Sequence, residues 1–312
     1  MGFLGHITVL KNELVQQMLE SSPSVKNRVF ADLTLGGAGH SLELLKKDPS
    51  CRVIGFDQDQ DALNEAKKLF EREGVSDRVK LCFSNFSEIS SVIESSKDFI
   101  EGGKLNGVMA DIGVSSHQFD KDTRGFSFRF DGPLDMRMNQ ASDLNAELVI
   151  NEYSKDELVD IFFKYGEEKL SKIIAENIIC ERKKERIQTT KQLENIIFHS
   201  YPKKWRYGRT HPATKVFQAL RIYVNKELEV LESVIPSAFD LLLDTGRLAI
   251  ITFHSLEDRI VKHSFRDLHQ KKEGRLIQRK PMLPSEEEIK VNPRSRSAKL
   301  RVIEKVTKDK GD

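Results

Sequence analysis

The stretch Val29–His40, VFADLTLGGAGH, has the pattern of a strand, a glycine-rich turn and the start of a helix. Val29–Asp32 is a short apolar run, and an amphipathic run with three leucines follows the turn. Glycines let the backbone approach a ligand closely, and the N–H groups of the first helical turn then face that ligand. The stretch therefore predicts the first unit of an open α/β sheet that binds a nucleotide-like ligand. A tight turn without a ligand is the alternative.

A second predicted strand, Arg52–Asp57, ends in a carboxylate. An acid at this place often binds a ribose diol, which nicotinamide dinucleotides, flavins and S-adenosylmethionine all carry. The turn has no glycine three residues after Gly39, as a pyrophosphate-binding turn would. Asp32 adds a negative charge that suits a cationic sulfonium better than a pyrophosphate. S-adenosylmethionine is therefore the favoured ligand.

Further strands alternate with amphipathic helices, which is typical of a doubly wound parallel sheet. The predicted strands are 79–83, 107–111, 248–253, 274–278 and 299–305. Phe86 follows the third strand, where its ring could stack on an adenine or close the core as an apolar plug.

The alternation stops after residue 113, and a long segment without periodicity precedes a set of helices. Segments of this kind inside compact domains are usually functional. Ser154 with Glu157, and Thr189 with Gln192, have the spacing of helix capping boxes. We expect an inserted all-helical domain over 119–212, with 1–118 and 213–312 forming the sheet domain. The helix that begins at Pro212 is expected to break at Pro236.

Positive charge is concentrated in two stretches, although the whole chain has a net charge of only +2. Residues 182–221 carry an excess of nine positive charges and residues 271–305 an excess of six. The asymmetry indicates a polyanionic partner such as RNA. An ordinary solvated helix face is the alternative.

Composition indicates a globular protein of the reducing cytoplasm. The chain has 312 residues, of which 38% are hydrophobic, enough for a sizeable core. Its longest apolar run, 248–253, is too short to cross a bilayer, and no amino-terminal signal pattern is present. The three cysteines are odd in number and lack metal-binding or redox spacing. The sequence leaves the oligomeric state open, and a homodimer is one option.

Several blocks, in order along nearly the whole chain, resemble the bacterial 16S ribosomal RNA (cytosine-N4)-methyltransferases. They are His6–Leu10 with Glu13, DLTLGGAGH from Asp32, DIGVSSHQFD from Asp111, TRGFSFRFDGPLDMRM from Thr123, YGEE from Tyr165, HPATKVFQALRIYVNKEL from His211, FHSLEDRIVK from Phe253 and NPRSRSAKLR from Asn292. The resemblance implies a class I (Rossmann-like) methyltransferase sheet with an inserted helical domain. The implied substrate is a cytidine in the decoding region of 16S rRNA, presented by the small ribosomal subunit.

The resemblance also implies a set of residues that contact S-adenosylmethionine. These are Ala38, Gly39, His40, Asp57, Phe86, Asp111 and Gln118. The family usually has glycine where this chain has Ala38. An alanine methyl is expected to fit there if φ is negative.

Methylation of a cytosine amine requires an acceptor for its proton, because the nitrogen lone pair is delocalised into the ring. Asp111 at the end of the fourth strand and His254 at the end of the fifth are the candidate catalytic residues. A strand-end cap is the alternative for Asp111, and a helix cap is the alternative for His254. Ring-carbon methylation would need a cysteine after the fourth strand, and no cysteine lies there.

Lys203, Lys204, Trp205 and Arg206 alternate cations with an aromatic ring, as RNA-stacking surfaces do, and are the candidate substrate-binding residues. A buried Trp205 that anchors its domain is the alternative. Two other functions stay open: an NAD-dependent oxidoreductase, and a non-catalytic RNA-binding assembly factor with a vestigial crevice.

Overall fold

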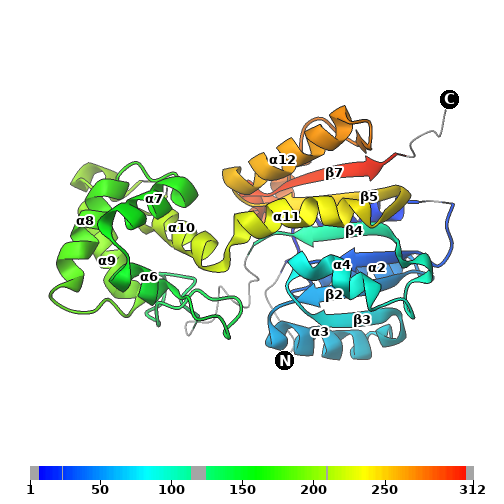
Figure 1. Cartoon of the computed structure of the whole chain (residues 1–312), viewed down its shortest axis with the longest axis horizontal. Coiled ribbons are helices and arrows are strands. Elements are labelled where there is room, and N and C mark those ends of the chain that lie inside the picture. Colours follow the sequence, from blue (N-terminus) through cyan, green and yellow to red (C-terminus); the bar gives the residue numbers. More distant parts are fainter. Residues whose placement is uncertain (1–6, 23, 114–123, 209, 307–312) are drawn as a thin grey trace. The chain divides into compact units, whose positions relative to one another are not determined.

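The computed structural model describes residues 7–22, 24–113, 124–208 and 210–306 (Figure 1). The chain forms two compact units. Met1–Gly113 and Leu228–Asp312 make up the sheet unit, and Val114–Glu227 make up the inserted unit. Among the described residues, no helix combines the length and the apolar character needed to cross a membrane.

The sheet unit contains one seven-stranded sheet in the order β3-β2-β1-β4-β5-β7-β6. The strands are β1 (Val29–Asp32), β2 (Arg52–Asp57), β3 (Val79–Phe83), β4 (Leu105–Asp111), β5 (Leu242–Thr252), β6 (Gly274–Leu276) and β7 (Lys299–Lys305). The first five run parallel, and β7 lies antiparallel between β5 and β6. The carboxyl ends of β1 to β5 therefore share one edge, where open α/β sheets bind ligands. The predicted doubly wound class is confirmed.

Helices cover both faces of this sheet. On one face lie α1 (Lys11–Leu19), α2 (Gly39–Lys47) and α3 (Gln60–Arg72), and on the other α4 (Ile89–Glu94), α11 (Glu227–Asp240) and α12 (Ser255–Gln270). Alternate strand residues enter the two cores: Phe30 packs with the first helix set, and Ala31 with the second. Burial on both faces explains why these strands are continuous apolar runs. A short helix, α13 (Glu286–Val291), lies between β6 and β7 in the chain.

The inserted unit is helical, as predicted. Its helices are α6 (Ala146–Glu152), α7 (Lys155–Gly166), α8 (Ser171–Arg182), α9 (Thr190–Ser200) and α10 (Ala213–Asn225). Both predicted capping boxes are present, at the starts of α7 and α9. The unit extends beyond the expected end at residue 212, because α10 packs against α7. A Cβ at Gly166 would lie 2.6 Å from the Lys215 carbonyl oxygen, so only glycine permits this close approach.

The helix break after Pro212 lies elsewhere than expected. Lys226, with φ 50°, ends α10 in the left-handed conformation, and its N–H bonds back to the Ile222 carbonyl. Pro236, expected to break the helix, lies inside α11. The apolar face of α11 is fully buried against the sheet, through Leu231, Val234, Ile235 and Ala238. Tertiary packing thus outweighs the local cost of the proline.

Candidate functional site

Four carboxylates gather where the parallel strands end. Asp32, Asp57 and Asp111 are the last residues of β1, β2 and β4, and Glu257 lies in the first turn of α12, after β5. Burial raises the pKa of Asp32 and Asp57 to about 6, and that of Asp111 to about 8. The charges of Asp32 and Glu257 add to the rise at Asp111. A carboxylate cluster of this kind favours a cationic ligand.

The glycine turn is fixed by Asp57. Its Oδ2 accepts the Gly36 N–H at 2.9 Å, and its Oδ1 accepts the Asp59 N–H at 2.9 Å. The carboxylate also accepts the backbone N–H of Gln58, so three of its roughly four acceptor sites are used and about one is left for a ligand. Asp57 can therefore shape the turn and still accept a ribose hydroxyl.

Ala38 adopts the left-handed conformation, with φ 57° and ψ 20°. The expectation of a negative φ at this alanine is wrong. The fully buried methyl group packs in the core on the α1–α3 side of the sheet. The next residue, Gly39, has no room for any side chain, because its Cβ would lie 1.9 Å from Thr8 Oγ1. The turn thus depends on glycine at 39 but tolerates alanine at 38.

The His40 side chain points into the protein. Its Nε2 lies 2.9 Å from the Val9 carbonyl oxygen, and the residue is buried. The ring therefore ties the amino-terminal segment to α2. The backbone of His40 lies in the first turn of α2, and the N–H groups of that turn favour an anionic group of a ligand.

Asp111 has a buried oxygen that lacks a partner. Its backbone N–H donates to Thr34 Oγ1 at 2.6 Å, but Oδ1 accepts no hydrogen bond within the described part of the chain. Asp32, by contrast, is satisfied: it accepts the Ser41 hydroxyl at 2.6 Å and the Thr34 N–H at 3.2 Å. Buried carboxylate oxygens rarely stay unpaired in native proteins, so Asp111 Oδ1 marks a place for a ligand donor.

His254 caps α12, which is the second of the two roles left open by the sequence. Its Nδ1 accepts the Glu257 N–H at 3.3 Å, and its Nε2 lies 2.9 Å from Glu257 Oε1. At this distance Nε2 nevertheless forms no hydrogen bond among the described residues, although it is buried. The capping role therefore occupies only Nδ1.

Thr34 and Glu257 are site residues that the sequence interpretation missed. Glu257 is fully buried, and its Oε2 accepts the Phe253 N–H at 2.8 Å. The spacing of His254 and Glu257, which matches a capping box, was the available signal. Thr34 had no such signal, because its contact with Asp111 joins two strands distant in the sequence.

Phe86 begins a short 3₁₀ helix, η2 (Phe86–Glu88), directly after β3. The ring is half-buried and packs against the core on the α4 side. The buried part of the ring closes the core as an apolar plug, and the rest of the ring is exposed. Gln118, the remaining predicted cofactor contact, lies outside the described residues.

None of the three cysteines directly follows β4 in the chain. Cys51 precedes β2 and is buried, Cys82 lies within β3, and Cys180 is exposed on α8. Burial raises the pKa of the Cys51 thiol to about 12, which keeps it protonated and unreactive.

The basic aromatic segment of the inserted unit is a second candidate site. η5 (Lys203–Trp205) leaves Trp205 52% exposed, so the alternative of a buried anchor is wrong. Lys204 Nζ lies 5.1 Å from the Trp205 ring centroid, and Tyr207 is 85% exposed. Arg206 is used structurally, since it donates to the carbonyl oxygens of Tyr201 and His199.

The residues at the sheet edge fit S-adenosylmethionine. Its sulfonium and ammonium groups match the carboxylate set and the unpaired Oδ1 of Asp111. Asp57 has an acceptor site for the ribose, and the start of α2 suits the carboxylate of the methionine part.

The sequence profile described as the MraW methylase family matches residues 3–306. Three similar proteins are each named "Ribosomal RNA small subunit methyltransferase H". The one from Clostridioides difficile is 46% identical, covering 96% of this chain and 99% of the relative. Those from a Picosynechococcus species and from Finegoldia magna are 47% and 42% identical, covering 96% of this chain and 96% and 98% of the relatives. This chain therefore belongs to the MraW methylase family, and S-adenosylmethionine is its cofactor.

Proposed function

We propose that this protein methylates the exocyclic N4 amine of a cytidine in the decoding region of 16S rRNA, within the small ribosomal subunit. The names of its relatives, which align along almost their whole length, support an rRNA substrate. The choice of the amine depends on one observation, the unpaired buried Oδ1 of Asp111 at the end of β4.

Asp111 is the proposed proton acceptor. When bound, S-adenosylmethionine supplies an electrophilic methyl group on a cationic sulfur. An ionised Asp111 would accept a hydrogen bond from the amine, which localises the nitrogen lone pair for attack. In the empty crevice the pKa of Asp111 is about 8, because of burial first and then the neighbouring carboxylates, so it is largely protonated at neutral pH. A nearby cation lowers a carboxyl pKa, so occupancy of the crevice would ionise Asp111.

His254 is proposed as a positioning residue that acts through Glu257. Its Nδ1 accepts the backbone N–H of Glu257 at the start of α12, and the Glu257 carboxylate raises the pKa of Asp111. His254→Ala should therefore slow methyl transfer and lower stability, because it removes the helix cap. His254→Asn, which retains a capping side chain, should restore stability and much of the rate.

Analysis of the product nucleoside tests the reaction. Undermethylated small subunits are incubated with labelled S-adenosylmethionine, and the modified nucleoside is identified by mass spectrometry. N4-methylcytidine is expected, also from a variant in which Cys51, Cys82 and Cys180 are all serine. Asp111→Asn at saturating cofactor should lower turnover by about 10²-fold or more. A methyl group on the ring carbon, or a folded cysteine-free variant without any turnover, would rule out the amine mechanism.

The surface of Lys203, Lys204, Trp205 and Tyr207 is proposed to bind RNA. Lys203→Gln with Lys204→Gln should lower the log–log salt slope of RNA binding by about 1–2. Trp205→Ala should weaken binding by roughly 1–3 kcal/mol if a base stacks on the ring. Lys169→Gln with Lys172→Gln, which removes two exposed charges from the same unit, is the matched control. Equal slopes for the two double variants would exclude this surface.

The non-catalytic alternative makes a different prediction. An assembly factor with a vestigial crevice would bind RNA equally well with and without cofactor and transfer no methyl group. The oxidoreductase alternative is disfavoured, because the acidic crevice would repel a pyrophosphate.

A further inference from the structure

We propose that a basic pocket between α12 and the β6–β7 edge of the sheet binds a phosphodiester of the RNA substrate. The residues of this pocket are separate in sequence from those of the Lys203 surface. Lys262, Arg266, Gln278, Arg279 and Arg301 line it, with an apolar floor of Phe265, Leu276 and Val302. This inference rests on the proposed function, because that function identifies the polyanion as rRNA.

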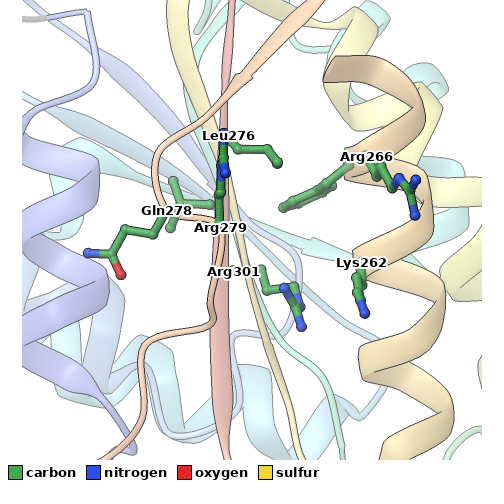
Figure 2. Close-up of a pocket in the computed structure, with 8 residues that line it drawn as sticks. Lys262, Arg266, Leu276, Gln278, Arg279 and Arg301 are labelled. Atoms are coloured by element: carbon green, nitrogen blue, oxygen red, sulfur yellow. The ribbon is translucent and has the colours of Figure 1, made fainter. Parts of the chain in front are cut away.

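The cationic side chains come from three different segments. Figure 2 shows Lys262 and Arg266 on successive turns of α12, Arg301 on β7, and Arg279 on the segment that follows β6. The cavity is partly open to solvent and has a volume of about 100 Å³, room for several water molecules or one tetrahedral oxyanion. Phe265 is almost fully buried in the core on the α12 side of the sheet, so this wall of the pocket is fixed.

The charge in this pocket is poorly neutralised by the protein itself. Arg301 has a carboxylate partner, since its Nε lies 2.7 Å from Asp258 Oδ1. Lys262, Arg266 and Arg279 form no ion pair within the ranges that the structure describes, and all three are exposed. Cations that line one cavity repel each other, and an anion bound beside them offsets that cost.

A polymer phosphate fits this pocket better than a free small anion. Sites that select small anions bury their charged groups and add backbone N–H donors, whereas three of these four cations are on the surface. Exposed lysine and arginine side chains along an edge are typical of contacts to a nucleic-acid backbone. Two of the four cations, Arg279 and Arg301, belong to the stretch 271–305, whose excess of six positive charges the Lys203 surface does not explain.

The test measures the salt dependence of binding to RNA from undermethylated small subunits. The full-length variant Lys262→Gln/Arg266→Gln/Arg279→Gln should lower the log–log salt slope by about 0.7–0.9, because the pocket neutralises one phosphate. Arg301 is left intact because it pairs with Asp258. The charge-conserving variant Lys262→Arg/Arg266→Lys/Arg279→Lys should retain the wild-type slope.

The matched control is Lys26→Gln/Lys67→Gln/Lys290→Gln, which removes three exposed charges elsewhere on the sheet unit. All variants should keep the wild-type melting temperature and cofactor affinity. A slope equal to that of the control overturns the proposal. Inorganic phosphate that saturates the wild-type pocket at low millimolar concentration, with an unchanged RNA slope, would identify a small-anion site and also overturn it. If wild type methylates small subunits while the pocket variant binds them normally, this inference fails and the proposed function stands.

Discussion

Ala38, in the glycine-rich turn after β1, is a position where the cost of a left-handed backbone is nearly offset by other contributions to stability. Ala38 is held at φ 57°, a conformation that costs an alanine about 1–2 kcal/mol. Glycine would avoid this cost but would lose about 0.4–1 kcal/mol through the greater freedom of the unfolded chain. It would also lose about 0.8 kcal/mol by removing a fully buried methyl group. These contributions are of similar size and opposite sign.

Ala38→Gly should therefore change the free energy of unfolding by no more than about 1 kcal/mol, measured by urea denaturation. Ala38→Val should lose more than about 2 kcal/mol, because a β-branched residue tolerates the left-handed conformation poorly and adds volume to a closed core. A large loss in the glycine variant would mean that packing of the methyl group dominates.

Asp111 should make stability depend on pH in an unusual direction. Its folded pKa of about 8 lies above the value of a free aspartate, because burial and the charges of Asp32 and Glu257 oppose ionisation. The folded state therefore binds the proton more tightly, and stability falls as pH rises from about 4 to about 8. Asp111→Asn should melt at the wild-type temperature at pH 4 and at least about 2 °C higher at pH 8.

Asp258 is the matched control, with the opposite sign. Burial raises its pKa, but hydrogen bonds from Arg301 and Lys299 outweigh burial and hold it below the usual value. Its contribution to stability is present above the pKa of a free aspartate and is lost as pH falls through the lower, folded value. Asp258→Asn should thus be destabilising at pH 8. If the two variants responded alike to pH, the Asp111 assignment would be wrong.

At the scale of elements, the sequence predicted those features that local patterns encode. β1, β2, β3 and β7 have the predicted bounds. β1 is a continuous apolar run up to its final aspartate, and β7 instead alternates charged and apolar residues over most of its length. Both capping boxes were readable from spacing alone. The end of α10 was not, because a lysine in the left-handed conformation at residue 226 has no sequence signature. The place of α10 in the inserted unit follows from its packing on α7, which local patterns do not encode.

Pro236 disfavours a helix locally, yet it lies inside α11 because the packing of that helix on the sheet outweighs the cost. Its ring is exposed, while Val234, Ile235 and Ala238 are buried. Pro236→Ala should stabilise the protein by about 1–2 kcal/mol, because it restores a helical N–H donor and removes a steric conflict. The measurement is the urea midpoint at constant m-value, with Ser233→Ala on the exposed face of α11 as a control for helix propensity. A destabilised alanine variant would mean that a proline bend is needed to seat α11.

At the scale of the whole molecule, the sheet topology creates the site. Asp32, Asp57, Asp111 and Glu257 are spread over more than 200 residues, and parallel strand order brings them to one edge. The first three could be predicted, because each ends an apolar strand. Thr34 could not, because its role comes from a contact between elements. Glu257 had one signal, its capping-box spacing from His254, which was missed. Whether Trp205 is buried or exposed could not be predicted either, because exposure depends on how the whole unit folds.

Because these carboxylates share one edge of the sheet, we expect binding of the cationic cofactor to release protons from them. The pKa values of about 6 for Asp32 and Asp57 and about 8 for Asp111 leave the empty crevice partly protonated at neutral pH. A cationic ligand lowers these pKa values together, because the groups are electrostatically coupled. Cofactor affinity should accordingly rise between about pH 6 and pH 8 and level off above that range.

Calorimetry at pH 7 in buffers of different ionisation enthalpy measures this release directly. We expect roughly one proton per S-adenosylmethionine bound, falling toward zero by about pH 9.5, where Asp111 is ionised before binding. S-adenosylhomocysteine, which lacks the sulfonium charge, should release markedly less at the same pH. Asp111→Asn should remove most of the difference between the two ligands, while leaving the smaller release from Asp32 and Asp57. Equal release with both ligands would show that the sulfonium does not face these carboxylates, and would exclude Asp111 from the reacting centre.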